Sequence, residues 1–256
     1  MDTWVEFGRG PLFRLAFSLM LLGLLRAVLL TLQNIAEAWF RCADKSLNIK
    51  SIVAETLAWL LPAGRLWRKR PVYSTISFLF HIGLIVVPLF LLAHIQLWRA
   101  AVGFAWPAIP AKAADWLTLL TILTGLALLI ARIAGRRMRA ISRTQDYLWP
   151  FLLVLPFLSG YLLSHASLSA AGYHRLMFIH VCSAALVMLL IPFTKIAHCV
   201  LLPFSQLATA IAWKFVPGSG DRVAATLGYA ERPCWIPNAR AEQAVQTPTP
   251  PEVVAK

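Results

Sequence analysis

The hydrophobic residues of this sequence gather in five long stretches, separated by shorter segments that carry charge, glycine or proline. A helix needs roughly 20 mostly apolar residues, each rising about 1.5 Å, to cross a hydrocarbon core of about 30 Å. Every stretch has that length, so the pattern predicts an all-α integral membrane protein with five transmembrane helices in a bundle. The stretches cover residues 11–32, 75–97, 114–134, 147–166 and 176–201.

Lysine and arginine alternate between rich and poor segments along the chain. Residues 33–74 carry seven, the connection after the third stretch carries four, and the segment from residue 202 onwards carries five. Each of the other three segments carries one or two. Because positive residues are retained on the cytoplasmic side, this alternation predicts the N-terminus outside and the C-terminus in the cytoplasm.

The predicted transmembrane domain covers residues 1–202 and includes an interfacial cytoplasmic segment at residues 33–74. Within that segment, residues 51–61 precede a basic run and are expected to form a helix under the inner leaflet. Residues 203–242 are predicted to be a cytoplasmic extension, and residues 243–256, which contain TPTPP, a disordered tail.

The composition also indicates a lipid environment. Hydrophobic residues make up 59% of the 256 residues and charged residues only 14%, whereas soluble domains carry about 25% charged residues. A net charge of +13 would suit nucleic acid, but a mean hydropathy of +0.69 leaves too little polar surface for it. The expected partner is therefore the lipid bilayer, with no nucleic acid.

The cysteines give no sign of a metal or haem attachment motif. Cys42, Cys182, Cys199 and Cys234 are far apart and form neither CxxC nor CxxCH. The spacing predicts no zinc ribbon, no iron–sulfur cluster and no covalently attached c-type haem.

Ionisable residues inside a membrane are costly and point to function, so their inventory is informative. All 11 acidic residues lie outside the apolar stretches or at their edges, which counts against an ion- or proton-coupled transporter. The second stretch contains His81 and His94, and the fifth contains His180 and His198. These four histidines are the candidate site.

The fifth stretch presents both of its histidines on one helix face, because 18 residues make five turns and separate them by about 27 Å. The second stretch runs in the opposite direction, so His81 is expected beside His198 near the cytoplasm and His94 beside His180 near the outside. Paired neutral imidazoles suit a six-coordinate haem iron, which suggests two b haems. Interhelical hydrogen bonding without a cofactor is the alternative.

The direction in which the His94 side chain points from its helix is the hardest of the four to predict. It lies 13 residues after His81, which is about 220° around an ideal helix and places the two on nearly opposite sides. Pro88 lies between them and removes a helical hydrogen bond, so the direction of His94 does not follow from an ideal helix.

Four segments resemble the gamma subunit of respiratory nitrate reductase and its relatives in membrane-bound electron-transfer complexes of anaerobic bacteria. The resemblance covers most of residues 5–222. The segments are GRGPLF near the start, SFLFHIG at 77–83, SRTQDYLWPFLLVLPFLSGYL at 142–162 and IHVCSAALVMLLIPFTKIAH at 179–198. The last segment is the most specific, because both histidines, their spacing and PFTK all fit.

The resemblance implies five helices that hold two b haems through histidines on the second and fifth helices, with quinol oxidised near the outer haem. His81, His180 and His198 match the family's ligand positions. His94 departs from the pattern, since the closer position is Leu91, which cannot ligate iron. Lys112 occupies the place where the family keeps a lysine near its quinol pocket.

The expected function is therefore a dihaem cytochrome b subunit of a respiratory complex in the bacterial inner membrane. It would transfer electrons between quinone or menaquinone on the outer side and a partner redox subunit, and would not be a complete enzyme. A molybdenum enzyme, an iron–sulfur protein or a multihaem cytochrome all remain open as the partner. The alternative from another class is a cofactor-free membrane anchor that docks a soluble oxidoreductase.

Haem propionates need cations, and five residues have a suitable depth in the predicted topology. A cation at such a position is more often a snorkelling or positive-inside residue than a propionate partner. The candidates are Arg99 and Arg175 on the outer side and Arg70, Arg143 and Lys195 on the inner side.

Overall fold

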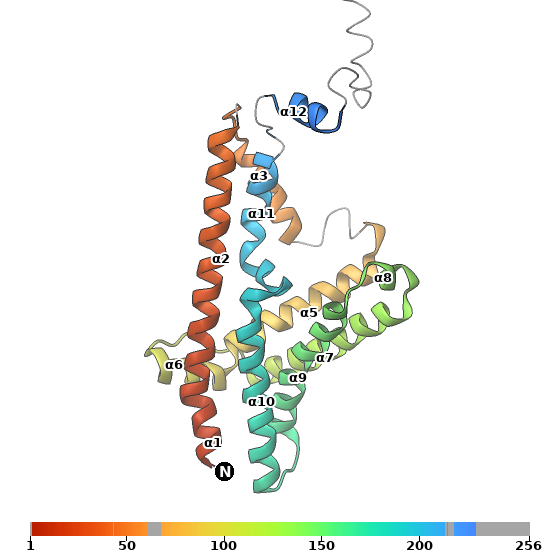
Figure 1. Ribbon diagram of the computed structural model, residues 1–256. Coiled ribbons are helices and arrows are strands. Elements are labelled where there is room, and N and C mark those ends of the chain that lie inside the picture. Colours follow the sequence, from red (N-terminus) through yellow and green to blue (C-terminus); the bar gives the residue numbers. More distant parts are fainter. Residues whose placement is uncertain (1, 43, 61–67, 213, 215–217, 229–256) are drawn as a thin grey trace, which may run out of the picture. The chain divides into compact units, whose positions relative to one another are not determined.

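The computed structural model describes residues 2–42, 44–60, 68–212, 214 and 218–228, and every regular element among them is a helix (Figure 1). The predicted all-α class is confirmed for this part of the chain. The elements are α1 (Asp2–Phe7), the π-helix η1 (Gly8–Leu12), α2 (Phe13–Arg41), α3 (Ile49–Leu60), α5 (Pro71–Phe90), α6 (Leu92–Val102), α7 (Ala111–Ala134), α8 (Arg136–Ile141), α9 (Thr144–His165), α10 (Ala170–Leu190), the 3-10 helices η2 (Ile191–Phe193) and η3 (Lys195–Ala197), α11 (His198–Ala212) and α12 (Ser219–Thr226).

Six helical stretches within the described residues are long and apolar enough to cross a membrane, which is compatible with a multi-pass membrane protein. The sequence pattern predicts five, and the difference lies in the stretch predicted at 176–201. The stretches are Thr3–Arg41, Pro71–Phe90, Ala111–Ala134, Thr144–His165, Ala170–Phe193 and Lys195–Ala212.

Two predicted stretches are interrupted helices. The one at 176–201 breaks between α10 and α11, where Pro192 lacks a donor for the helical ladder and Thr194 is extended at φ −133° and ψ 179°. The one at 75–97 breaks at Leu91, which is extended at φ −70° and ψ 129° between α5 and α6. Both interruptions lie close to histidines of the candidate site.

The chain forms two compact units, residues 1–33 with 48–206 and residues 34–47 with 207–256. In the second unit, Lys214 contacts the carboxylate of Asp44, and hydrogen bonds from Lys214 and Ser46 hold the pKa of that carboxyl well below its ordinary value.

The segments predicted outside the bundle are covered only in part. Helix α3 occupies most of the segment predicted as an interfacial helix at 51–61. The predicted cytoplasmic extension begins within α11, and the predicted tail at 243–256 lies outside the described residues.

The core of the first unit lies between α5, α7 and α9. Its buried side chains come from all three helices, so these helices form one packed group. They are Phe80, Val87, Ile122, Val154 and Phe157.

Small residues let these three helices approach closely. A Cβ at Gly83 would lie 1.6 Å from Oγ1 of Thr121, and a Cβ at Gly125 would lie 2.6 Å from Cγ2 of Val154. Thr121 is fully buried, and its hydroxyl donates to the carbonyl of Leu117 at 2.6 Å. Since its own helix satisfies the hydroxyl, threonine is tolerated in an apolar contact.

The N-terminal helical stretch packs along α10. A Cβ at Gly8 would lie 2.8 Å from Cγ1 of Val181, and a Cβ at Gly23 would lie 2.7 Å from Cβ of Pro192. Both residue numbers increase from one contact to the next. The N-terminal stretch and α10 therefore run parallel.

Candidate functional site

The structure brings the four histidines together as two pairs. The ring centres of His94 and His180 are 6.2 Å apart with planes at 15°, and those of His81 and His198 are 6.1 Å apart with planes at 74°. These are the cross-helix pairs that the topology predicts. Their order is opposite along the two segments, so α5 and α6 run antiparallel to α10.

The break at Leu91 allows His94 to face His180 although His81 lies 13 residues earlier. Helix α6 is a separate helix that begins at Leu92. The direction of the His94 side chain is therefore not set by the helical repeat of α5. The Nδ1 atom of His94 lies 3.1 Å from the carbonyl oxygen of Pro88. The carbonyl is a hydrogen-bond acceptor that helps to fix the ring.

His180 is held by the neighbouring helix α9. Its Nδ1 lies 2.9 Å from the carbonyl oxygen of Pro156 and 3.2 Å from the hydroxyl of Ser159. The ring also lies against Gly160, where an added Cβ would be 3.0 Å from Cε1 of His180. The sequence Pro156–Gly160 thus forms one side of the His180 site.

The second pair is held by backbone atoms close to each histidine in sequence. The Nδ1 of His81 lies 2.6 Å from the carbonyl oxygen of Ser77, and the Nδ1 of His198 lies 2.6 Å from that of Lys195. Both His81 and His198 are exposed, whereas the residues of the first pair are half-buried.

All four histidines share one hydrogen-bonding arrangement. Each Nδ1 meets a backbone carbonyl, which can only accept, so the proton lies on Nδ1 and the lone pair on Nε2. Within the described part of the chain, no hydrogen bond reaches Nε2 of any of the four. A neutral imidazole with a fixed tautomer and an available Nε2 is the form that ligates a metal.

The spacing of the rings suits an axial ligand pair. A metal–imidazole bond is about 2 Å long and the ring centre lies about 1 Å further, so two imidazoles on opposite sides of one iron have centres roughly 6 Å apart. Aromatic rings in simple contact span about 4.5–7 Å, so the tautomer pattern discriminates better than the distance. The described residues contain no group of three or more His, Cys, Asp and Glu suited to a metal ion, and each pair supplies only two nitrogens.

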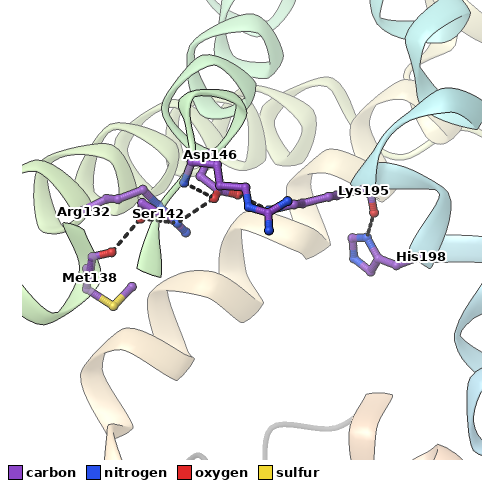
Figure 2. Close-up of polar contacts among 7 residues, drawn as sticks. Arg132, Met138, Ser142, Asp146, Lys195 and His198 are labelled. Carbon is purple, nitrogen blue, oxygen red and sulfur yellow. Dashed lines mark hydrogen bonds and ion pairs between the residues drawn. The ribbon is translucent and has the colours of Figure 1, made fainter. Parts of the chain in front are cut away.

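A polar network adjoins the second pair (Figure 2). The carboxylate of Asp146 lies 2.7 Å from Nζ of Lys195 and 4.0 Å from Nη1 of Arg132, and it accepts the backbone N–H of Arg143 at 2.8 Å. The backbone carbonyl of Lys195 in turn accepts a hydrogen bond from Nδ1 of His198. The network connects α7 and α9 to the segment that carries a site histidine.

The cations predicted as propionate partners have other contacts or are exposed. Lys195 is bound to Asp146, Arg175 donates to the carbonyl of Ala171 at 3.2 Å, and Arg70 lies 3.4 Å from the sulfur of Met138. No ion pair, hydrogen bond or ring contact in the described residues joins these side chains to a site histidine; the same holds for Arg99 and Arg143. Lys112 is exposed in the first turn of α7.

Two residues near the site were not singled out from the sequence. Arg9 belongs to η1, whose Gly8 packs against Val181, the residue that follows His180. Asp146 counted only as an acidic residue at the edge of a stretch. The signal available for Asp146 is its position among cations, since the connection before it carries four arginines.

Comparison with known proteins gives one similarity. The chain is 31% identical over 204 residues to a protein of Nitratidesulfovibrio vulgaris strain Hildenborough whose name states no activity. The match covers 78% of this chain and 89% of that protein. No family model matches the chain, and no solved structure matches it.

Proposed function

We propose that this chain, which belongs to the same family as the Nitratidesulfovibrio vulgaris protein, is a dihaem cytochrome b subunit of a respiratory complex in the bacterial inner membrane. The observation that carries the proposal is the presence of two histidine pairs with ring centres 6.1 and 6.2 Å apart and every Nδ1 on a backbone carbonyl. The similarity to the nitrate reductase gamma subunit in the segments around these histidines supports the same function.

The donor set suits a non-covalent b haem. Each pair, His94 with His180 and His81 with His198, would hold one haem through its two Nε2 atoms. A bis-histidine haem supplies one-electron transfer, because no iron position is left for another ligand. The protein residues orient the imidazoles and hold their tautomers through Ser77, Pro88, Pro156 and Lys195.

Five crossings fit the chain better than six. Ala170–Phe193 and Lys195–Ala212 are separated by Thr194 alone, and one residue is too short a connection to reverse a helix between two crossings. The parallel course of the N-terminal stretch and α10 suits the first and fifth crossings of such a bundle. The charge pattern then directs the N-terminus and the His94–His180 pair outward, and the His81–His198 pair toward the cytoplasm.

In this topology the two pairs connect opposite faces of the membrane. A quinone or menaquinone is the substrate on the outer side, where Lys112 begins α7. The partner redox subunit, whether a molybdenum enzyme, an iron–sulfur protein or a multihaem cytochrome, exchanges electrons on the cytoplasmic side. The exposure of His81 and His198 suits a position near that partner.

The first test is the haem content of the purified, detergent-solubilised protein. A pyridine haemochrome assay should give about two b haems per chain, because two histidines are needed for each six-coordinate iron. Absence of haem in protein isolated from its native membrane would favour the cofactor-free anchor.

Single replacements test the ligands. His180→Ala and His198→Ala should each remove one spectrally distinct haem. His165→Ala should retain both, because Nε2 of His165 lies 3.4 Å from the carboxylate of Asp115 and is not in either pair. Retention of both haems in His180→Ala or His198→Ala would refute the assignment.

A further inference from the structure

The carboxylate of Asp146 joins its own helix, α9, to two other elements. It belongs to the first turn of α9 and binds Lys195 of η3 and Arg132 of α7 (Figure 2). The Asp146 side chain is only 13% exposed, whereas that of Lys195 is 54% exposed. The ion pair is therefore shielded on its acidic side, which strengthens it relative to a pair on an open surface.

The segment that Lys195 belongs to needs an outside support. Thr194 is extended and residues 195–197 form a single 3-10 turn, so no continuous α-helical ladder fixes their place. His198 follows directly and its Nδ1 is bound to the carbonyl of Lys195 at 2.6 Å. Because this contact orients the ring, a displacement of the Lys195 carbonyl would change the direction of the His198 ring.

We propose that the Asp146–Lys195 ion pair is a positioning device that ties the 3-10 turn before His198 to α9 and so sets the orientation of this histidine. The inference rests on the proposed function, in which His198 is a haem ligand. Asp146 and Lys195 act through the backbone and are positioning residues. The pair thus links the angle of an axial ligand to the packing of α9.

Two simpler roles make different predictions. Asp146 also caps α9 by accepting the N–H of Arg143, and Lys195 is also a cytoplasmic-side cation. If the two residues acted only through their charges, removing the carboxylate would raise the reduction potential of the nearer haem and removing the ammonium would lower it. Positioning predicts that both removals disturb His198 in the same way.

The experiment uses the full-length protein with both haems bound and compares Asp146→Asn, Lys195→Met and the double variant. Lys195→Arg keeps a cation at this position and should behave like the wild type. Arg136→Met is the matched control. Arg136 is an exposed cation at the start of α8, on the side of the membrane proposed to be cytoplasmic, and it does not belong to this network. The readouts are the haem content, the potential of each haem and the electron paramagnetic resonance of the ferric form, which reports the angle between the two imidazole planes.

Both single variants should change the resonance of the haem bound by His81 and His198 and leave the other haem unaltered. They should also weaken retention of that haem by about 10-fold, at the lower end of the usual effect of outer-shell partners. The double variant should resemble either single one, and Arg136→Met should match the wild type. Potentials that move in opposite directions with unchanged resonances, or equal loss of both haems, would overturn the proposal; a wild-type protein without haem would instead overturn the proposed function.

Discussion

The most informative feature at the scale of single residues is the contact of each site histidine with a backbone carbonyl. Because a carbonyl only accepts, it selects the Nδ1–H tautomer without a charged partner. A carboxylate in the same place would add a charge in low dielectric, which is costly inside a membrane. The observed arrangement therefore orients four neutral imidazoles at small electrostatic cost, which is what the proposed haem ligands need.

Gly160 is expected to be essential for the ring of His180. In Gly160→Ala, the new methyl group would lie 3.0 Å from Cε1 and 3.3 Å from Nδ1 of that ring, so the ring must shift. We expect the proposed haem at the His94–His180 pair to be bound roughly 10-fold more weakly, as when a residue that orients a metal ligand is changed, and the other proposed haem to be unaffected. Haem difference spectra of the purified variant measure this.

Ser159→Ala provides the matched control for that change. The Ser159 hydroxyl is 3.2 Å from Nδ1, but the Pro156 carbonyl at 2.9 Å remains as an acceptor. Both haems should be retained. Full haem content in Gly160→Ala, or equal losses in the two variants, would contradict the role of Gly160.

At the scale of elements, the interruption at Leu91 is stabilised by partners for each carbonyl that it leaves unpaired. The carbonyl of Pro88 meets His94, that of Leu89 accepts the indole N–H of Trp106 at 2.8 Å, and that of Phe90 accepts the N–H of Ile109 at 3.0 Å. Unpaired carbonyls inside a membrane protein are costly, so these partners make the break a defined feature.

Trp106→Phe should weaken the support of His94 while preserving an aromatic ring. The Leu89 carbonyl would lose its side-chain donor, so the interruption that positions His94 would lose one of its hydrogen bonds. We expect the haem at the His94–His180 pair to be released at a lower temperature, measured by its absorption during heating. Trp116→Phe makes the same substitution at a ring of α7 that is 73% exposed, and it should leave this temperature unchanged. Identical release temperatures for Trp106→Phe and the wild type would refute this support.

The sequence predicts the helices better than it predicts their interruptions. Apolar length alone locates the stretches, and Pro88 shows that the direction of His94 cannot follow from an ideal helix. The break at Leu91 depends on Trp106 and Ile109, which follow 15 or more residues later, and no local pattern indicates such contacts. In the same way, the tie between Asp146 and Lys195 joins residues 49 positions apart, so charge type alone suggests a lipid-facing or propionate-binding lysine.

At the scale of the first unit, the contacts between segments give the directions in which the helices run. The N-terminal stretch runs parallel to α10, while α5 and α6 run antiparallel to it. An arrangement of this kind brings the start of one segment beside the end of the other, which is the condition for two pairs at two depths. Two depths in turn are what transfer of electrons across a membrane requires.

The number of crossings is testable because it decides whether the two termini lie on the same side. Five crossings place them on opposite sides, whereas six would place them together. Epitope tags at the N-terminus and next to Ser167 should be accessible in intact spheroplasts, and tags at the C-terminus and next to Arg137 should become accessible only after lysis. The last two positions belong to segments that carry five and four Lys and Arg residues, and such segments are retained in the cytoplasm. A C-terminal tag that is accessible together with the N-terminal one would require Lys195–Ala212 to cross separately, and would refute the arrangement of five crossings.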